Sequence, residues 1–214
     1  MKKKSGSRRR TKVVHRSKKN LRRTGKRKSL AKGRRRPTRR HSRIQRGGAP
    51  PVEYAAAQVN LGNMYYHGRG VARNYAEAAQ LYRLAAEQGH AGAQFKLGVM
   101  FESGKGVERD YAEAVKLYSL AADQGNADAQ VSLGFMYYNG KGVDRNQKEA
   151  IRLFNLAAAQ GNARAQEKLG FMYYNGKGVD RNQEEAIRLF NLAAEQGNAN
   201  ALDALGRLSV DWPL

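Results

Sequence analysis

The chain repeats itself every 36 residues, and this period restricts its fold more than any other feature. Residues 134–158 read GFMYYNGKGVDRNQKEAIRLFNLAA and return at 170–194 with one difference, Lys148 against Glu184. Two more divergent copies precede them, and glycines keep the register in each copy: Gly62, Gly98, Gly134, Gly170 and Gly206. A fixed period of this length is typical of a solenoid, in which each unit buries its apolar face against its neighbours.

The first half of each repeat predicts a helix, at residues 57–66, 93–102, 129–138 and 165–174. In the first copy Ala57, Leu61, Met64 and Tyr65 have the spacing i, i+4, i+7 and i+8, which places them on one helical face. We expect that face to be buried. A glycine inside a helix costs about 0.5–1 kcal/mol relative to alanine, so its recurrence predicts a neighbouring helix where a Cβ would stand.

A GxGV turn leads to a second helix in each repeat. An Asn or Asp at its start is followed three residues later by Glu, which predicts a capping box in every copy: Asn74 and Glu77, Asp110 and Glu113, Asn146 and Glu149, Asn182 and Glu185. Tyr75, Ala78, Tyr82 and Ala85 supply the expected buried face. Gly89 and its counterparts should end the helix at the C′ position, and Asn126, Asn162 and Asn198 should cap the first helix that follows.

The combined pattern AxAQxxLGxMY…GxGVxxDYxxA…LYxxAAxQG resembles the Sel-1-like repeat, a longer-turn relative of the tetratricopeptide repeat. The resemblance covers four units (57–90, 91–126, 127–162 and 163–198), with a partial unit at 199–214 whose more polar helix suits a terminal cap. It implies an all-α fold, a right-handed α-solenoid of four helix-turn-helix repeats in residues 50–214. It also implies a scaffold that binds a protein partner through its concave surface.

If this resemblance holds, a partner groove should be lined by the first helices. The positions equivalent to 59, 63 and 66 form an aromatic strip that could hold a peptide or helix, or could simply pack between adjacent helices. The candidate residues are Val59, Asn63, Tyr66, Phe95, Val99, Val131, Phe135, Tyr138, Phe171 and Tyr174.

Residues 1–49 form a basic arm of a different character. They contain 23 of the 40 Lys and Arg residues and no Asp or Glu, whereas the remaining residues carry 17 basic and 18 acidic side chains, a net charge of −1. Dense like charge with few apolar residues predicts a disordered segment. The residues Gly47, Gly48, Pro50 and Pro51 mark the boundary with the repeats.

The arm allows two functional interpretations. Clustered cations displace the counterions on phosphates, which favours contact with DNA or RNA, and the absence of aromatic residues before Tyr54 predicts binding without sequence preference. Alternatively, the arm is only a nuclear or nucleolar address, because Arg22–Arg23 and Arg34–Arg36 resemble a bipartite import signal. The candidate residues for either role are Lys2, Lys3, Lys4, Arg8, Arg9, Arg10, Arg22, Arg23, Lys26, Arg27, Lys28, Arg34, Arg35, Arg36, Arg39 and Arg40.

The sequence offers no constellation for catalysis. It has no cysteine, and His67 and His90 stand alone in the repeats without a partner at ligand spacing. We therefore expect no enzymatic activity, cofactor, metal, small-molecule substrate or membrane insertion. A nuclear or nucleolar protein is the expected setting, with a virion or the cytoplasm as alternatives.

Overall fold

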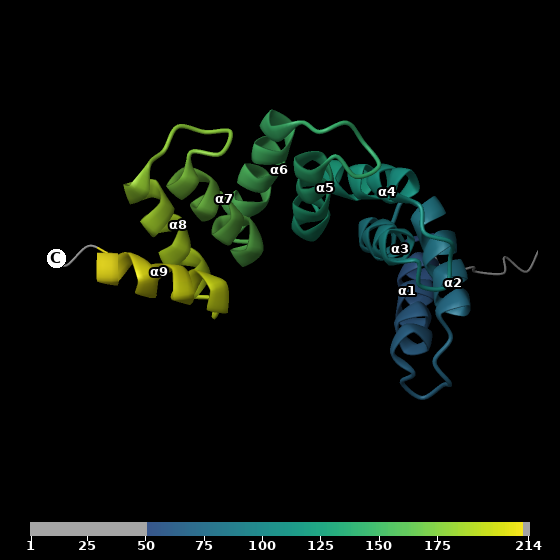
Figure 1. The fold of residues 1–214 in the computed structure, drawn as a ribbon. Coiled ribbons are helices and arrows are strands. Elements are labelled where there is room, and N and C mark those ends of the chain that lie inside the picture. The colour runs from purple at the N-terminus through teal and green to yellow at the C-terminus, as the bar shows by residue number, and fades with distance from the viewer. Residues whose placement is uncertain (1–50, 212–214) are drawn as a thin grey trace, which may run out of the picture. The chain divides into compact units, whose positions relative to one another are not determined.

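A computed structural model describes the backbone of residues 51–211 and the side chains of residues 54–208. This part of the chain contains nine α-helices and no strand (Figure 1). The predicted arm lies outside the described residues, so its disorder stays a prediction. The helices are α1 (Pro51–His67), α2 (Tyr75–Glu87), α3 (Ala91–Ser103), α4 (Tyr111–Asp123), α5 (Ala127–Asn139), α6 (Gln147–Ala159), α7 (Ala163–Asn175), α8 (Gln183–Ala194) and α9 (Ala199–Asp211).

Each helix makes its most extensive contacts with its neighbours in the chain. Each odd-numbered helix from α1 to α7 pairs with the even-numbered helix that follows it, and each even-numbered helix packs against the next odd one. The four pairs are the four predicted repeats, and α9 is the single helix of the fifth unit. This nearest-neighbour packing confirms the all-α solenoid.

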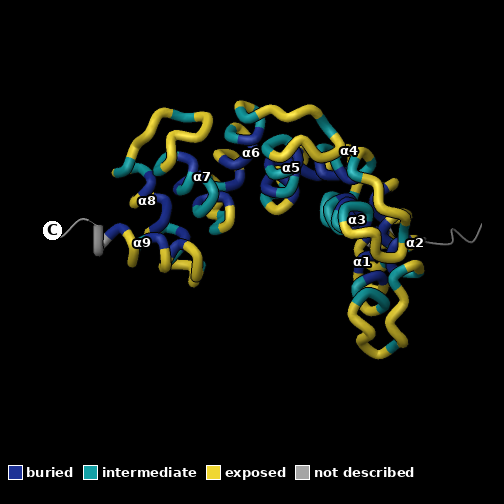
Figure 2. The backbone as a smooth tube through the Cα atoms, viewed as in Figure 1, coloured by how far each residue is buried: buried dark blue, intermediate teal, exposed yellow. Residues whose placement is uncertain are grey.

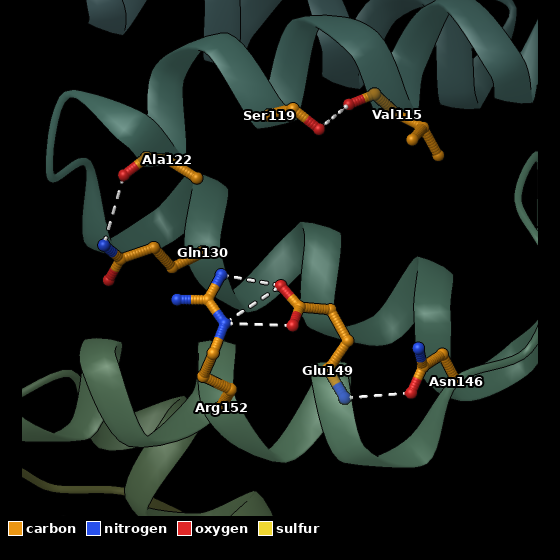
Figure 3. Close-up of polar contacts among 7 residues, drawn as sticks. All are labelled: Val115, Ser119, Ala122, Gln130, Asn146, Glu149 and Arg152. Carbon is orange, nitrogen blue, oxygen red and sulfur yellow. Dashed lines mark hydrogen bonds and ion pairs between the residues drawn. The ribbon is translucent and has the colours of Figure 1, made fainter.

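The predicted N-caps are present in all four second helices. The backbone N–H of Glu149 donates to Oδ1 of Asn146 at 3.1 Å, as Figure 3 shows, and Asn74, Asp110 and Asn182 accept equivalent bonds. The reciprocal half of the predicted capping box is replaced. The side chains of Glu113, Glu149 and Glu185 instead pair with a cation one turn further along, as in the 2.6 Å contact between Glu149 and Arg152. The reciprocal bond is not formed because the N-cap backbone N–H donates to a carbonyl oxygen of the first helix in every repeat, as Asn146 does to Tyr137 at 2.9 Å.

The glycines inside the first helices are explained by close approach of a ring. A Cβ built on Gly134 would lie 2.6 Å from Cε1 of Phe154, and one on Gly62 would lie 2.7 Å from Cε1 of Tyr82. Gly98 and Gly170 meet Tyr118 and Phe190 in the same way. The predicted neighbouring helix is therefore confirmed, and it approaches through its largest buried side chain.

Each GxGV turn joins the two helices of one repeat, and the turn at Gly142 also contacts the preceding repeat. A Cβ on Gly142 would collide with the backbone of Tyr111 at the start of the preceding second helix, and the residue has a φ of +68°. Both facts restrict this position to glycine. The turn thus docks on the previous repeat.

The core follows the predicted pattern except at its first unit. Leu97, Leu133 and Leu169 are 5% exposed or less and lie in clusters with residues of the preceding second helix. In the first repeat the predicted buried face is wrong, because Leu61 is 40% and Met64 38% exposed. No second-type helix precedes α1 in the described residues, so nothing there covers that face (Figure 2).

A buried amide network that the sequence analysis missed also joins the repeats. Gln130 of α5 is 4% exposed, and its Nε2 donates to the carbonyl oxygen of Ala122 at the end of α4 (Figure 3). Its Oε1 accepts from Nε2 of Gln160 at 2.8 Å. Gln94 and Gln166 repeat both contacts. Because a buried amide is costly unless it is bonded, each glutamine fixes three helices in one register.

Candidate protein-interaction surface

Partly exposed rings from three successive first helices form what we call the aromatic strip: Phe95 of α3, Phe135 and Tyr138 of α5, and Phe171 and Tyr174 of α7. The phenylalanines rest on the buried rings of the second helices. The centroid of Phe135 lies 5.2 Å from that of Phe154, and the centroid of Phe171 lies 4.9 Å from that of Phe190, both in edge contact. These rings therefore pack partly into the core and remain partly exposed. Partner binding at the strip stays a prediction.

Two of the candidate groove residues belong to the core instead. Val59 is 8% exposed and Val131 is fully buried, so neither side chain is available to a partner. Val131 lies in one cluster with Ala165 and Leu169, and Val59 clusters likewise with residues of α3. The next first helix covers this position, which the spacing within a single helix does not reveal. Val99 is partly exposed, as predicted for a surface residue.

In the first two repeats, polar side chains of the first helices bond to the buried rings of the second helices. There the second helices carry tyrosine, and the hydroxyl of Tyr82 donates to Oδ1 of Asn63 at 2.8 Å while that of Tyr118 donates to Oε2 of Glu102 at 2.7 Å. Burial raises the pKa of Tyr82 to about 12. Burial, and then the bond to Glu102, raise the pKa of Tyr118 well above its usual range. Tyr66, the last of the candidate residues, packs edge-on against Tyr75 at 5.1 Å.

Cations lie over the rings of the third and fourth repeats. Nζ of Lys168 is 5.2 Å from the centroid of Phe135 and 4.9 Å from that of Tyr138. Cζ of Arg164 is 5.8 Å from the centroid of Phe135, and Arg145 and Arg181 lie over Tyr138 and Tyr174. These distances are within the range of cation–π attraction.

The sequence analysis did not identify Arg164 and Lys168, although a signal was present. The near-identical third and fourth repeats differ at five positions, three of them in the first helix: Asp128 and Arg164, Val131 and Glu167, Ser132 and Lys168. Arg164 and Lys168 are four residues apart and so share one face of α7. The differences between the two copies thus concentrate where the cations meet the strip.

The two histidines of the repeats have local roles. Nδ1 of His90 accepts a bond from the backbone N–H of Ala93 and so caps α3, and His67 packs edge-on against Tyr66. Within residues 54–208, no group of three or more acidic or histidine side chains could hold a metal ion. No helix in the described part is both long and apolar enough to span a bilayer. The candidate residues of the arm, Lys2 to Arg40, lie outside the described residues.

The Sel1 repeat profile matches residues 55–90, 91–126, 127–162 and 163–198, about two thirds of the chain. The chain belongs to the Sel1 repeat family. Sel1 repeat proteins act as scaffolds for protein interactions. No curated protein matched the sequence.

Two solved Sel1 repeat structures resemble the chain over most of its described length. The protective antigen c5321 of uropathogenic Escherichia coli is 38% identical with a TM-score of 0.70, and the match covers 75% of this chain and 34% of the antigen. A Sel1 repeat protein from Oxalobacter formigenes is 39% identical with a TM-score of 0.65, covering 69% of this chain and 59% of the other. The chain thus matches less than two thirds of the length of either relative.

Proposed function

We propose that this chain is a non-enzymatic scaffold that binds a protein partner across the aromatic strip, and that its basic arm ties the complex to nucleic acid. The observation that carries the first part is the row of partly exposed rings on α3, α5 and α7. Aromatic side chains at such positions are the usual anchors of protein interfaces. The family relationship supports the same role.

Paired alanine substitutions test the strip. Phe135→Ala with Phe171→Ala should weaken partner capture by about 2 kcal/mol or more, a typical magnitude for interface anchors. Because both rings also pack on Phe154 and Phe190, the free energy of unfolding must be measured for the same variant. Lys148→Glu is the matched control, since Glu184 occupies the equivalent position in the next repeat. The proposal would be contradicted if the double variant captured less partner only because a smaller fraction of it is folded.

The charge of residues 1–49 supports the nucleic-acid tether. That segment holds 23 basic residues and no acidic one, whereas the repeats are nearly neutral. A polycationic segment binds phosphates by releasing counterions and reads no sequence. The arm therefore suits a role that holds the scaffold near DNA or RNA while leaving the strip free.

An address role for the arm is the second candidate, favoured by the two basic clusters at Arg22–Arg23 and Arg34–Arg36. It would place the scaffold in the nucleus or nucleolus without binding nucleic acid there. Pull-downs of the full chain with and without nuclease treatment separate the two. Loss of part of the captured set after treatment supports the tether, whereas an unchanged set supports the address. Proximity labelling with the full chain and with a version lacking residues 1–49 would then identify the compartment and the neighbours.

A further inference from the structure

The cations on the aromatic strip have no carboxylate partner within the described residues. The four ion pairs found there join Lys116 to Glu113, Arg152 to Glu149, Arg188 to Glu185 and Arg207 to Asp203. All four are pairs within one helix, and none includes Arg164 or Lys168. Arg164 lies over the ring of Phe135 and Lys168 over those of Phe135 and Tyr138, and the charge of Arg164 also acts on Tyr118.

The carboxylates near the strip are already engaged. Oδ1 of Asp128 accepts from Nδ2 of Asn162 at 3.0 Å, and Glu167 accepts from Asn198 at 2.9 Å and from Asn200 at 3.3 Å. Glu102 accepts from the hydroxyl of Tyr118. The acidic groups thus have hydrogen bonds inside the repeats, while Arg164 and Lys168 keep their capacity to bind an anion.

We propose that the strip on α5 and α7 binds an acidic peptide segment that carries an aromatic or aliphatic anchor. This proposal rests on the proposed function and names the chemistry of the partner. Carboxylates of the peptide would pair with Arg164 and Lys168, and the anchor would pack on Phe135 and Tyr138. A guanidinium can bind a carboxylate through two parallel hydrogen bonds, and an ammonium binds it as a point charge.

Charge also argues against an intramolecular occupant. The charged side chains of residues 1–49 are all positive, so this segment would be repelled by Arg164 and Lys168. An acidic partner segment would instead be attracted both to the cations of the strip and to residues 1–49. The experiment must therefore separate binding at the strip from binding at the arm.

Photocrosslinking of the full chain makes this separation. The probe is a short peptide with a central photoreactive phenylalanine flanked by glutamates, and two matched peptides carry glutamines or lysines instead. Crosslinked residues are mapped by mass spectrometry. We expect the glutamate peptide to crosslink to α5 and α7 as well as to residues 1–49, and the glutamine and lysine peptides to crosslink to α5 and α7 about tenfold less.

Substitutions at the strip test the assigned contacts. Arg164→Gln and Lys168→Gln should each lower the yield on α5 and α7 by about five- to tenfold, a range typical of an interfacial charge, without changing the yield on the arm. Lys168→Arg should retain most of the yield. Lys116→Gln is the control, because Lys116 is an exposed cation on α4 already paired with Glu113.

The outcomes distinguish the inference from the proposed function. Equal crosslinking of the strip by the glutamate and glutamine peptides would overturn the acidic specificity while leaving the strip as a binding surface. Crosslinks confined to residues 1–49 with all peptides would overturn the inference. Loss of partner capture in the double phenylalanine variant would still support the proposed function in that case.

Discussion

The residue type at some positions of this protein is limited by the space that the next helix leaves for a side chain. Gly134 and Gly206 occupy equivalent positions, yet a Cβ on Gly134 would press on the ring of Phe154 whereas one on Gly206 meets nothing within 4 Å. The same residue type is thus required by packing at one site and not at the other. The comparison isolates the ring contact from the intrinsic cost of glycine in a helix.

We therefore expect opposite effects from one substitution at the two sites. Gly134→Ala should lower the free energy of unfolding by about 1–3 kcal/mol, because the ring must move in a packed core. Gly206→Ala should be neutral or raise it by up to about 1 kcal/mol through helix propensity. Urea unfolding measures both. Equal effects of the two substitutions would contradict the packing explanation.

The buried tyrosines predict a dependence of stability on alkaline pH. The native chain keeps the proton of Tyr82 up to a pKa of about 12, whereas the unfolded chain loses it near 10. Between these values the native state binds more protons, so the free energy of unfolding falls as pH rises and is at its full value below pH 10. Tyr82→Phe should make the free energy of unfolding decrease less steeply at alkaline pH. Below pH 10 the same substitution should lower the free energy of unfolding by about 1 kcal/mol, because the bond to Asn63 is lost. An unchanged alkaline slope would contradict the assignment.

At the scale of helices, stability depends on whether a repeat has a neighbour on each side. Leu133 is 5% exposed between α4, α5 and α6, while the equivalent Leu61 of α1 is 40% exposed. Leu133→Ala should lower the free energy of unfolding by about 2–5 kcal/mol. Leu61→Ala should lower it by less than about 1 kcal/mol, as surface substitutions do. Comparable losses would mean that another segment covers α1 in solution.

The sequence predicted the helices and their ends well because those depend on local chemistry. The Asx caps and the αL glycines are read from residues close in the chain, and the 36-residue register is read from the repetition of the sequence. The burial of Val131 and the bond from Gln130 to Ala122 depend on how one repeat lies on the next. A glutamine recurring between apolar positions of every first helix was nevertheless a signal of that amide network. The contact of Lys168 with the ring of Phe135 joins two repeats in the same way, and its signal was a difference between copies.

At the scale of the whole molecule, the arm and the repeats are expected to divide the work of binding. Residues 1–49 should account for all binding to duplex DNA and to RNA, because the remaining residues have a net charge of −1. If the arm contacts about 6–10 phosphates, the affinity should drop by about 10³–10⁵ between about 50 and 200 mM salt. Base changes in single-stranded probes should have little effect, since no aromatic residue precedes Tyr54.

Titrations of the full chain and of a version lacking residues 1–49 measure this division. Neutralising Arg34, Arg35 and Arg36 together should flatten the salt dependence, whereas replacing lysines by arginines should change it little. Binding that ignores salt, or that survives removal of the arm, would show that the arm does not act as a tether.

The equivalence of the junctions between repeats has a consequence for how such a chain can evolve. Asn126 and Asn162 cap the helices that follow them in the same way, and Gln130 and Gln166 bond to the same carbonyl of the preceding repeat. A coding segment of one repeat can therefore be lost or duplicated in frame. The new junction between repeats would form the same cap and glutamine contacts as the original junction. The length of the aromatic strip can then change independently of the side chains that form it. Point changes such as those that distinguish Arg164 and Lys168 from Asp128 and Ser132 can specialise one copy while its twin preserves the fold.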